Sequence, residues 1–375
     1  MNPAQRNLHE RLRNFLRDGR LNPGDRLPSE RELAAEMRVG RTVLRPVLDV
    51  LEEEGVLVRR PQAGTFLAFI PPPYVQGARV AVIAAFDNSA HTLHMTDPGW
   101  LHRVAAAFER SAAAAGASLI VLDQSPLAGD PCSIKILALQ AADAGANAAV
   151  LIHPAGTKHV IAHAMAMLHD RGIHPVIVSA RTYSGLASQV YFDSAWGSYL
   201  ATRHLISHGH SRIGYAAASS GHEWVHERLT GYRDALEAAE VEVLPEWAHI
   251  PGDGERMPSQ EDGAAALKYW LSLPAAQRPT GIVAGNDTIA LGLIEAAREH
   301  GLTVPGDLSV VGFDNDPAAL VARLTTIDRP TEALGEAVAQ VTLERFAAGS
   351  TAAATVVHRL RPVLIERGTV ASPRQ

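Results

Sequence analysis

The 375-residue sequence predicts an α/β protein with a small N-terminal helical module and a larger body of parallel sheets. Two observations support this fold class. Residues 25–67 contain two short amphipathic helical segments followed by a hairpin pattern. From residue 78 onward, short continuous aliphatic runs alternate with helical segments, as in parallel sheets covered on both faces. The chain is long for one core, so two or three domains are expected.

The first helix of the N-terminal module is predicted from a capping box. Ser29 and Glu32 stand in the S-x-x-E pattern, in which two reciprocal side-chain bonds satisfy the free N–H groups of a helix start. An apolar stripe follows, and the helix is expected to break at Val39-Gly40; the stripe consists of Leu33, Ala34 and Met37.

A second helix is expected to begin near Arg41 and to end before Gly55, a good residue for the position after a helix. Its inner face is Val43, Leu44, Val47, Leu48 and Leu51. Residues 56–60 and 65–67, separated by a turn at 61–64, then predict a two-stranded wing. The module is therefore predicted to be a winged helix-turn-helix, which presents arginines to DNA.

This stretch resembles the winged helix-turn-helix of the gluconate-repressor (GntR) family of bacterial transcription factors. The resemblance rests on residues 23–34, 41–45, 51–55 and 64–66. It implies contacts with DNA, mainly through arginines that can bond guanine in a bidentate manner, while hydroxyl and backbone groups position the protein on phosphate. The residues expected at DNA are Ser29, Arg31, Arg41, Thr42, Arg45, Gln62 and Gly64.

Two residues depart from the family pattern. Pro46 lies inside the second helix, where it removes one backbone bond and costs about 3 kcal/mol unless the helix bends. Gly40 stands where a stronger N-cap such as serine is expected. The alternative interpretation of this module is an amphipathic helical unit with a solvated arginine face. Residues 1–70 hold 12 Arg and 10 Asp+Glu, a net charge of +2 against −8 for the remainder, which favours specific, dimer-dependent DNA binding.

The composition is that of a soluble globular protein, with 47% hydrophobic and 20% charged residues. No apolar run is long enough to span a bilayer, and the N-terminus lacks the apolar segment of an export signal. The single cysteine, Cys132, cannot form an internal disulfide, as is usual in a reducing compartment. We therefore expect a cytoplasmic protein.

Three consecutive prolines, at 71–73, predict a stiff linker at residues 70–77 between a DNA-binding domain at 1–69 and a body at 78–370. Buried strands are predicted in the body at residues 79–84, 119–122, 148–152, 175–178, 190–192, 212–216, 247–250, 281–284 and 309–313, with helices between them. Glycines that can end these helices are Gly116, Gly145, Gly172, Gly209 and Gly301.

The body resembles the two-lobed, periplasmic-binding-protein-like sensor of lactose-repressor (LacI) family regulators. The residues that carry the resemblance are 193–197, 204–210, 228–232, 285–292, 305–314, 324–327 and 362–368. The combination with the N-terminal module resembles the arabinose-responsive hybrid repressors. It implies a homodimer that binds operator DNA and a small effector in the cleft between the lobes.

Ligands of open α/β sheets bind outside the carboxyl ends of the strands, so the polar residues that follow strands are site candidates. These are Asp87, Asn88, Asn286, Asp287 and Asp314. The resemblance implies that Arg228, Asn286 and Asp314 hold a polyol or nucleobase-type effector, since a guanidinium donates two bonds and a carboxylate accepts from vicinal hydroxyls. An apolar face for a ring is expected from Phe86, Trp100 or Trp224.

Three of these candidates, and the nearby Asp193, have a structural alternative. Asp287 precedes a helix and is interpreted as its cap, and Asp193 is equally well explained as a cap. Asn286 could be a turn residue, and Arg228 could pair with an acid on its own helix.

Two further departures bear on the effector. Ser179-Ala180-Arg181 replaces a pattern with an aspartate, and Arg329 stands where glutamine is expected. Fewer acids and an added guanidinium suggest a sugar acid as one class of effector.

Eight of the seventeen histidines form two clusters in the sequence, namely His91, His94 and His102, and His204, His208, His210, His222 and His226. No H-E-x-x-H or Cys/His zinc spacing accompanies them, so no metal or cofactor is predicted. No P-loop, nucleophile elbow or dinucleotide fingerprint is present, so an enzyme is not predicted. The sequence predicts a ligand-responsive transcription regulator, more often a repressor than an activator. The alternative is a solute-binding receptor without a role in transcription.

Overall fold

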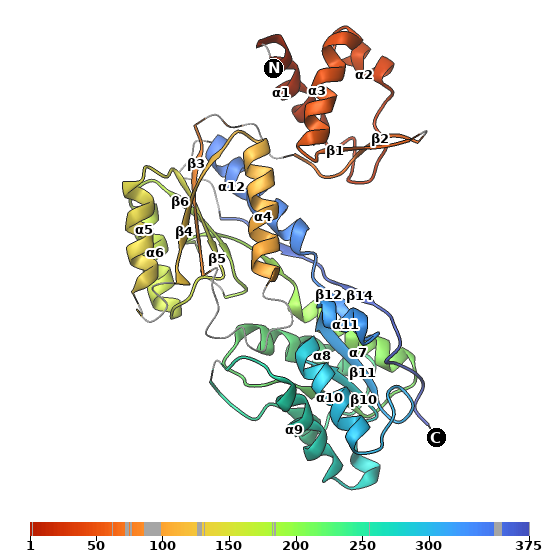
Figure 1. Cartoon of the computed structure of the whole chain (residues 1–375). Coiled ribbons are helices and arrows are strands. Elements are labelled where there is room, and N and C mark those ends of the chain that lie inside the picture. The colour runs from red at the N-terminus through yellow and green to blue at the C-terminus, as the bar shows by residue number, and fades with distance from the viewer. Residues whose placement is uncertain are drawn as a thin grey trace. The chain divides into compact units, whose positions relative to one another are not determined.

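The computed structural model describes residues 1, 3–61, 63–71, 75, 77–85, 99–125, 130, 132–181, 183, 185–254, 256–348 and 355–374. The chain forms two compact units (Figure 1). The first unit comprises Met1–Phe86, Leu101–Val190 and Glu332–His358, and the second comprises Asp87–Trp100, Tyr191–Thr331 and Arg359–Gln375. The chain passes between the units more than once, so neither unit is a continuous segment.

The N-terminal module has three helices and an antiparallel hairpin, which confirms the predicted winged helix-turn-helix. The elements are α1 (Pro3–Arg17), α2 (Glu30–Glu36), α3 (Arg41–Glu53), β1 (Leu57–Arg60) and β2 (Gly64–Leu67). Helix α1, which the sequence analysis did not predict, contributes Leu8, Leu12 and Leu16 to a buried core with α2 and α3. The apolar stripes of the three helices thus meet in one small core.

The turn between α2 and α3 is closed by hydrogen bonds that follow the end of α2. The N–H of Val39 donates to the carbonyl of Ala34 at 3.0 Å, and that of Arg38 to the carbonyl of Ala35 at 3.1 Å, as in a Schellman motif. Arg38, with φ +52°, takes the left-handed position that glycine usually occupies. The break predicted at Val39-Gly40 is confirmed, and Gly40 is the extended N-cap of α3, the position at which a stronger capping residue was expected.

The first unit contains a six-stranded sheet in the order β13-β7-β6-β5-β3-β4. Strands β4, β3, β5, β6 and β7 pair in parallel. Figure 1 shows α5 and α6 on one side of the sheet and α4 and α12 on the other. The strands are β3 (Arg79–Ala84), β4 (Ser118–Asp123), β5 (Ala148–Ile152), β6 (His174–Val178), β7 (Ser188–Phe192) and β13 (Val357–Leu360). The helices are α4 (Gly99–Ala114), α5 (Ser133–Asp143), α6 (Lys158–His169) and α12 (Thr331–Ala347).

The second unit contains a second six-stranded sheet, in the order β14-β12-β11-β10-β8-β9, with β14 antiparallel to β12 and the other pairs parallel. One apolar core joins the sheet to α9 and α10, and another joins it to α7 and α8. The strands are β8 (Ile213–Ala216), β9 (Ala248–His249), β10 (Gly281–Ala284), β11 (Ser309–Asp314), β12 (Thr325–Asp328) and β14 (Val363–Ile365). The helices are α7 (Ser194–Ser207), α8 (Glu223–Ala238), α9 (Gln260–Leu271), α10 (Asp287–Glu299) and the short α11 (Pro317–Val321).

The predicted alternation of strands and helices is confirmed, and the C-terminal strands β12, β13 and β14 add to it. Asp193 caps α7, because its side chain accepts the N–H of Trp196 at 2.9 Å. This agrees with the interpretation of Asp193 as a helix cap. Within the described residues, no helix has the length and apolar character needed to cross a membrane. The domain boundaries at 69 and 78 stay predictions.

Candidate nucleic-acid interface and effector site

Four of the predicted DNA-contacting residues lie exposed on the two helices of the helix-turn-helix. Helix α3 buries Leu44, Val47, Leu48 and Leu51, so its other face is turned to solvent. Arg41, Thr42 and Arg45 lie on that exposed face, in the first two turns, and Arg31 is exposed on α2. Because no side chain caps the start of α3, its first N–H groups are also available to an anion.

The side chain of Arg45 is 66% exposed and pairs with Glu30 at 3.0 Å. An ion pair this exposed contributes little to stability, so Arg45 can exchange Glu30 for another acceptor at small cost. Helix α3 continues through Pro46 to Glu53. Since proline has no N–H, the carbonyl of Thr42 lacks its usual partner four residues along. Burial of the apolar face offsets this loss.

The wing is fixed to α3 by ion pairs. Arg59 of β1 pairs with Asp49 at 2.7 Å and with Glu52 at 2.9 Å, and the hydrogen bond to Asp49 raises the pKa of Arg59. Gly64 has φ +112°, and a Cβ there would lie 2.7 Å from Nε of Arg26. Glycine is therefore needed at the wing turn. Gln62 lies outside the described residues.

Ser29, also predicted to contact DNA, has its hydroxyl engaged in the capping box. Its N–H and hydroxyl both donate to Oε2 of Glu32, at 2.9 and 2.7 Å, and its Oγ accepts the N–H of Glu32 at 3.4 Å. The cap hydrogen bonds lower the pKa of Glu32. This confirms the predicted cap and ties Ser29 to the start of α2.

A cluster of two arginines and one aspartate lies at the carboxyl edge of the second sheet. Asp314 ends β11, and its Oδ1 accepts from Nη2 of Arg228 at 3.2 Å and lies 3.1 Å from Nε of Arg329. Arg228, on α8, is 4% exposed and also donates from Nη1 to the carbonyl of Gly285. The interpretation in which Arg228 pairs on its own helix is wrong, because its partner comes from β11. We call Arg228, Asp314 and Arg329 the arginine–aspartate cluster.

Aromatic rings enclose the two guanidinium groups of this cluster. The Arg228 guanidinium carbon lies 3.5 Å from the ring centroid of Phe313 and 4.5 Å from that of Trp224. That of Arg329 lies 5.3 Å from Trp100 and 5.5 Å from Phe192. Burial lowers the pKa of Arg228. Aromatic rings attract the positive charge of a guanidinium group and keep water away from it. Because the planar guanidinium groups stack against these rings, they are held in fixed orientations.

Two of the expected aromatic residues therefore already contact cations, and Trp224 is also stacked with His222 at 5.5 Å between ring centroids. Sequence analysis did not single out Phe192 and Phe313. Phe192 ends β7 and Phe313 is the last residue but one of β11. The rule that selected Asp314 considered only polar residues at strand ends, so it could not find these two rings. Phe86, Asp87 and Asn88 lie outside the described residues.

The cap of α10 is the residue before the one predicted. Asn286 is the N-cap and accepts the N–H of Ile289 at 2.9 Å, so the interpretation of Asp287 as the cap is wrong. Asp287 is buried and accepts the hydroxyl of Thr326 at 2.6 Å and the N–H of Asp316 at 2.8 Å. Burial, together with the nearby charge of Asp314, raises the pKa of Asp287 to about 7.

Several buried polar atoms of this unit have no hydrogen-bond partner among the described residues. They include Oγ of Ser219, Oε2 of Glu227 and Nε of Arg228. Ser219 follows β8 and is 2% exposed. Burial and the neighbouring acids Glu223 and Asp193 raise the pKa of Glu227 to about 7. Unsatisfied buried groups cost stability, so donors and acceptors here are available to a ligand.

Comparisons with known proteins agree with this architecture. The family model for bacterial regulatory proteins of the gntR family matches residues 4–67, and that for the periplasmic binding protein-like domain matches residues 202–370. The chain therefore carries a gntR-family domain at its N-terminus and a periplasmic binding protein-like domain in its body. Both resemblances seen in the sequence are thus confirmed, as is the fold class.

Several relatives found by sequence are named as transcriptional repressors. The chain is 35% identical over 213 residues to the HTH-type transcriptional repressor PurR of Proteus mirabilis (strain HI4320), covering 56% of this chain and 60% of the relative. It is 37% identical over 211 residues to PurR of Serratia proteamaculans (strain 568), covering 55% and 59%. The chain thus spans less than two thirds of the length of these curated relatives.

Solved structures show the same fold. The transcriptional regulator CelR in complex with cellobiose is 22% identical, with a TM-score of 0.62, over 92% of this chain and 100% of that one. A LacI family regulator from Enterococcus faecium with bound ribose is 21% identical, with a TM-score of 0.61, over 79% and 100%. At this identity the likeness concerns the fold.

Proposed function

We propose that this hybrid protein is a sequence-specific DNA-binding transcription regulator, acting as a repressor, whose operator affinity is controlled by a small sugar-like effector. The observation that carries the proposal is the exposed face of α3, where Arg41, Thr42 and Arg45 stand opposite a buried apolar face. The gntR-family match over residues 4–67 supports DNA binding, and the names of the relatives support repression.

On this proposal, Arg31, Arg41 and Arg45 contact base edges in the major groove, because arginine is the preferred bidentate partner of guanine. Thr42 and the wing residues Gln62 and Gly64 contact the backbone or the minor groove. Ser29 contributes through the start of α2. We further propose a homodimer on a two-fold operator, since helix-turn-helix proteins bind paired half-sites in this way. A protein that acts on the bacterial chromosome works in the cytoplasm, so we propose that location for this chain. We also propose that it acts by binding and catalyses no reaction.

The DNA part is tested by fluorescence anisotropy with labelled duplexes from the DNA upstream of the chain's own gene. We expect saturable binding that weakens with salt, and a loss of about 1–3 kcal/mol for Arg45→Ala. Arg20→Ala is the matched control, because Arg20 has the same charge and a side chain 65% exposed, and it also pairs with acids. Equal losses from both substitutions, or equal affinity for unrelated duplexes, would contradict sequence-specific binding.

For the effector, we propose that the arginine–aspartate cluster holds a sugar derivative at the carboxyl edge of the second sheet. Asp314 can accept bonds from hydroxyls, and Arg228 and Arg329 donate from fixed forks. The cluster has two positive groups and one negative group, and Asp287 is only partly ionised near neutral pH. An excess of guanidinium favours an anionic ligand such as a sugar acid over a neutral sugar.

Calorimetric titration of the full chain with gluconate, galacturonate, ribose and cellobiose tests this proposal. We expect a sugar acid to bind more tightly than the neutral sugars and Arg329→Gln to reduce that preference. Arg298→Gln, at an exposed arginine of α10, is the control and should leave it unchanged. A preference for a neutral sugar would overturn the sugar-acid proposal but would leave the DNA-binding proposal standing. Control by the effector is tested separately: the compound that binds must change the affinity for the labelled duplex in the anisotropy titration.

We also propose the domain bounds 1–69, 70–77 and 78–370. The gntR-family match, which ends at residue 67, supports the first of them.

A further inference from the structure

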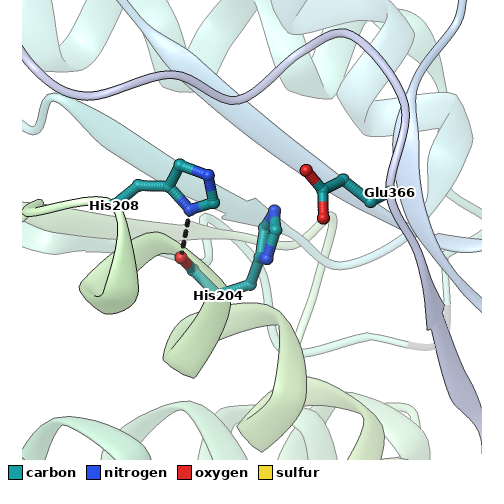
Figure 2. A group of neighbouring side chains, drawn as sticks. All are labelled: His204, His208 and Glu366. Carbon is teal, nitrogen blue, oxygen red and sulfur yellow. Dashed lines mark hydrogen bonds between the residues drawn. The ribbon is translucent and has the colours of Figure 1, made fainter.

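We propose that His204, His208 and Glu366 form a binding site for a divalent transition-metal ion of the zinc type. The site is independent of the proposed DNA and effector functions. His204 lies in the last turn of α7, His208 is the C-cap of the same helix, and Glu366 directly follows β14. Figure 2 shows the two imidazole rings side by side, with the carboxylate of Glu366 turned toward His204.

The helix brings the two histidines together, because residues four apart lie on the same face of an α-helix. Their ring centroids are 4.5 Å apart and the rings are inclined at 60°. One ligand atom from each of the three residues lies within 4.8 Å of the other two. The chain thus gathers two imidazole nitrogens and one carboxylate oxygen at one point.

The orientation of His208 leaves its outer nitrogen available to a metal. Its Nδ1 lies 2.9 Å from the carbonyl oxygen of His204 (Figure 2). A carbonyl can only accept, so Nδ1 carries the proton and Nε2 keeps its lone pair. Metal-binding histidines usually have such a bond from the second ring nitrogen, because it fixes both the tautomer and the orientation of the ring.

His204 supplies the second nitrogen. Its Nε2 is buried and has no hydrogen-bond partner among the described residues. Burial, and then the neighbouring His208, lowers the pKa of His204. Neutral imidazole is the form that binds a metal. A bound ion would also satisfy a buried nitrogen that otherwise costs stability.

Glu366 is exposed and can move toward the two rings. The adjacent Arg367 does not compete for this carboxylate, because its guanidinium donates to Asn315 at 2.6 Å and to the carbonyl of Leu324 at 2.7 Å. Ligands around tetrahedral zinc, at about 2.0–2.1 Å from the ion, are roughly 3.3 Å apart. Rotation of the Glu366 side chain can supply the small closure that is needed.

The ligand set selects the kind of ion. Two imidazoles and one carboxylate suit Zn²⁺, Co²⁺, Ni²⁺ or Cu²⁺, whereas Ca²⁺ and Mg²⁺ prefer oxygen ligands. Three protein ligands leave a coordination position for water. A bound ion would connect the end of α7 to the segment after β14, and it would stabilise the second unit by mass action. Sequence analysis had predicted no metal, because no recognised zinc-binding spacing accompanies the histidines. Glu366 lies far from them in the chain, so the sequence did not connect it with them.

The test uses the full chain without an affinity tag, after treatment with a chelator. Calorimetric titration with Zn²⁺ should show one saturable site per chain, and Co²⁺ should give the visible absorption of a tetrahedral complex. Added Zn²⁺ should raise the melting temperature, whereas Mg²⁺ should not. We expect His208→Ala and Glu366→Gln each to reduce zinc affinity by about tenfold or more.

His226→Ala is the matched control, because His226 is an exposed histidine of α8 in the same unit and lies outside the cluster. It should leave zinc affinity unchanged. The melting temperature of each metal-free variant shows whether it is folded, and Glu366→Gln, at an exposed position, keeps the test valid if His208→Ala does not fold. Zinc binding that is absent, or equally tight in Glu366→Gln, or weakened equally by His226→Ala, would overturn the proposal.

Discussion

Replacing Asp287 with asparagine should remove a pH dependence from the stability of the second unit. Asp287 is fully buried at the first position of α10, and its two hydrogen-bond partners are the hydroxyl of Thr326 and the N–H of Asp316. Asparagine has the same shape and no charge. Its carbonyl can accept one of these bonds, and its amide can donate to the hydroxyl of Thr326.

The sign follows from the two pKa values of Asp287. The pKa is raised to about 7 in the folded chain, whereas it is about 3.9 in an unfolded chain. Between these values the folded protein binds a proton that the unfolded chain has released. The free energy of unfolding should therefore be highest near pH 4 and fall as the pH rises toward 7.

The difference between the two pKa values corresponds to about 4 kcal/mol, at about 1.4 kcal/mol for each tenfold change. The positive end of the α10 dipole favours the charged form by up to about 2 kcal/mol, so a loss of about 2–4 kcal/mol is expected. Asp287→Asn should lack this loss. The variant should be within about 1 kcal/mol of the natural protein at pH 5 and more stable at pH 8.

Urea unfolding followed by tryptophan fluorescence measures this difference, because all five tryptophans lie in the second unit. Glu227, with its own raised pKa of about 7, should leave some pH dependence in both proteins, so the comparison between them is the informative quantity. Glu295→Gln, at an exposed acid on the same helix, serves as the control. Parallel stability curves for the natural protein and Asp287→Asn between pH 5 and 8 would refute this reasoning.

Three further substitutions probe the packing of the chain. Glu54→Ala removes the acid that pairs at 2.9 Å with Arg13, a residue 1% exposed. It should lower the free energy of unfolding by about 3–5 kcal/mol, measured by urea unfolding followed by circular dichroism. A loss below about 1 kcal/mol would be inconsistent with a buried pair. Gly231→Ala places a Cβ 1.8 Å from the carbonyl oxygen of Ala195, so α7 and α8 must separate. We expect the free energy of unfolding, followed by tryptophan fluorescence, to fall by at least about 1–3 kcal/mol. An unchanged stability would contradict the close contact of the two helices. Arg38→Gly relieves a left-handed residue and should raise the thermal midpoint of the N-terminal module by an amount equivalent to about 1 kcal/mol or less, whereas a decrease would show that the Arg38 side chain stabilises the turn.

The sequence by itself determined the elements whose signals are local. The capping box of Ser29 and Glu32, the apolar stripe of α3 and the strand at residues 79–84 were all predicted because each depends on residues within a few positions of one another. The two family resemblances also came from ordered local motifs. The same locality explains why Asp314 was found: polar residues at strand ends can be recognised without knowing the order of the strands.

Only the tertiary structure decided which of these residues meet. Arg228 pairs with Asp314 because α8 packs against the sheet in which β11 lies between β10 and β12, and neither the pairing nor the ring of Phe313 beside it can be inferred from spacing. Asn286 and Asp287 were both plausible caps. The hydroxyl of Thr326, far away in the chain, donates to the buried carboxylate of Asp287, whereas the side chain of Asn286 accepts the N–H of Ile289 and caps the helix. Glu366 joins His204 and His208 only through the return of the chain after β14. Local hydrogen bonds and periodic patterns depend on residues that are close together in the chain, so they can be predicted from the sequence. Contacts between distant segments depend on the order of the strands and on helix packing. In a parallel sheet, the crossover connections do not show that order in the sequence.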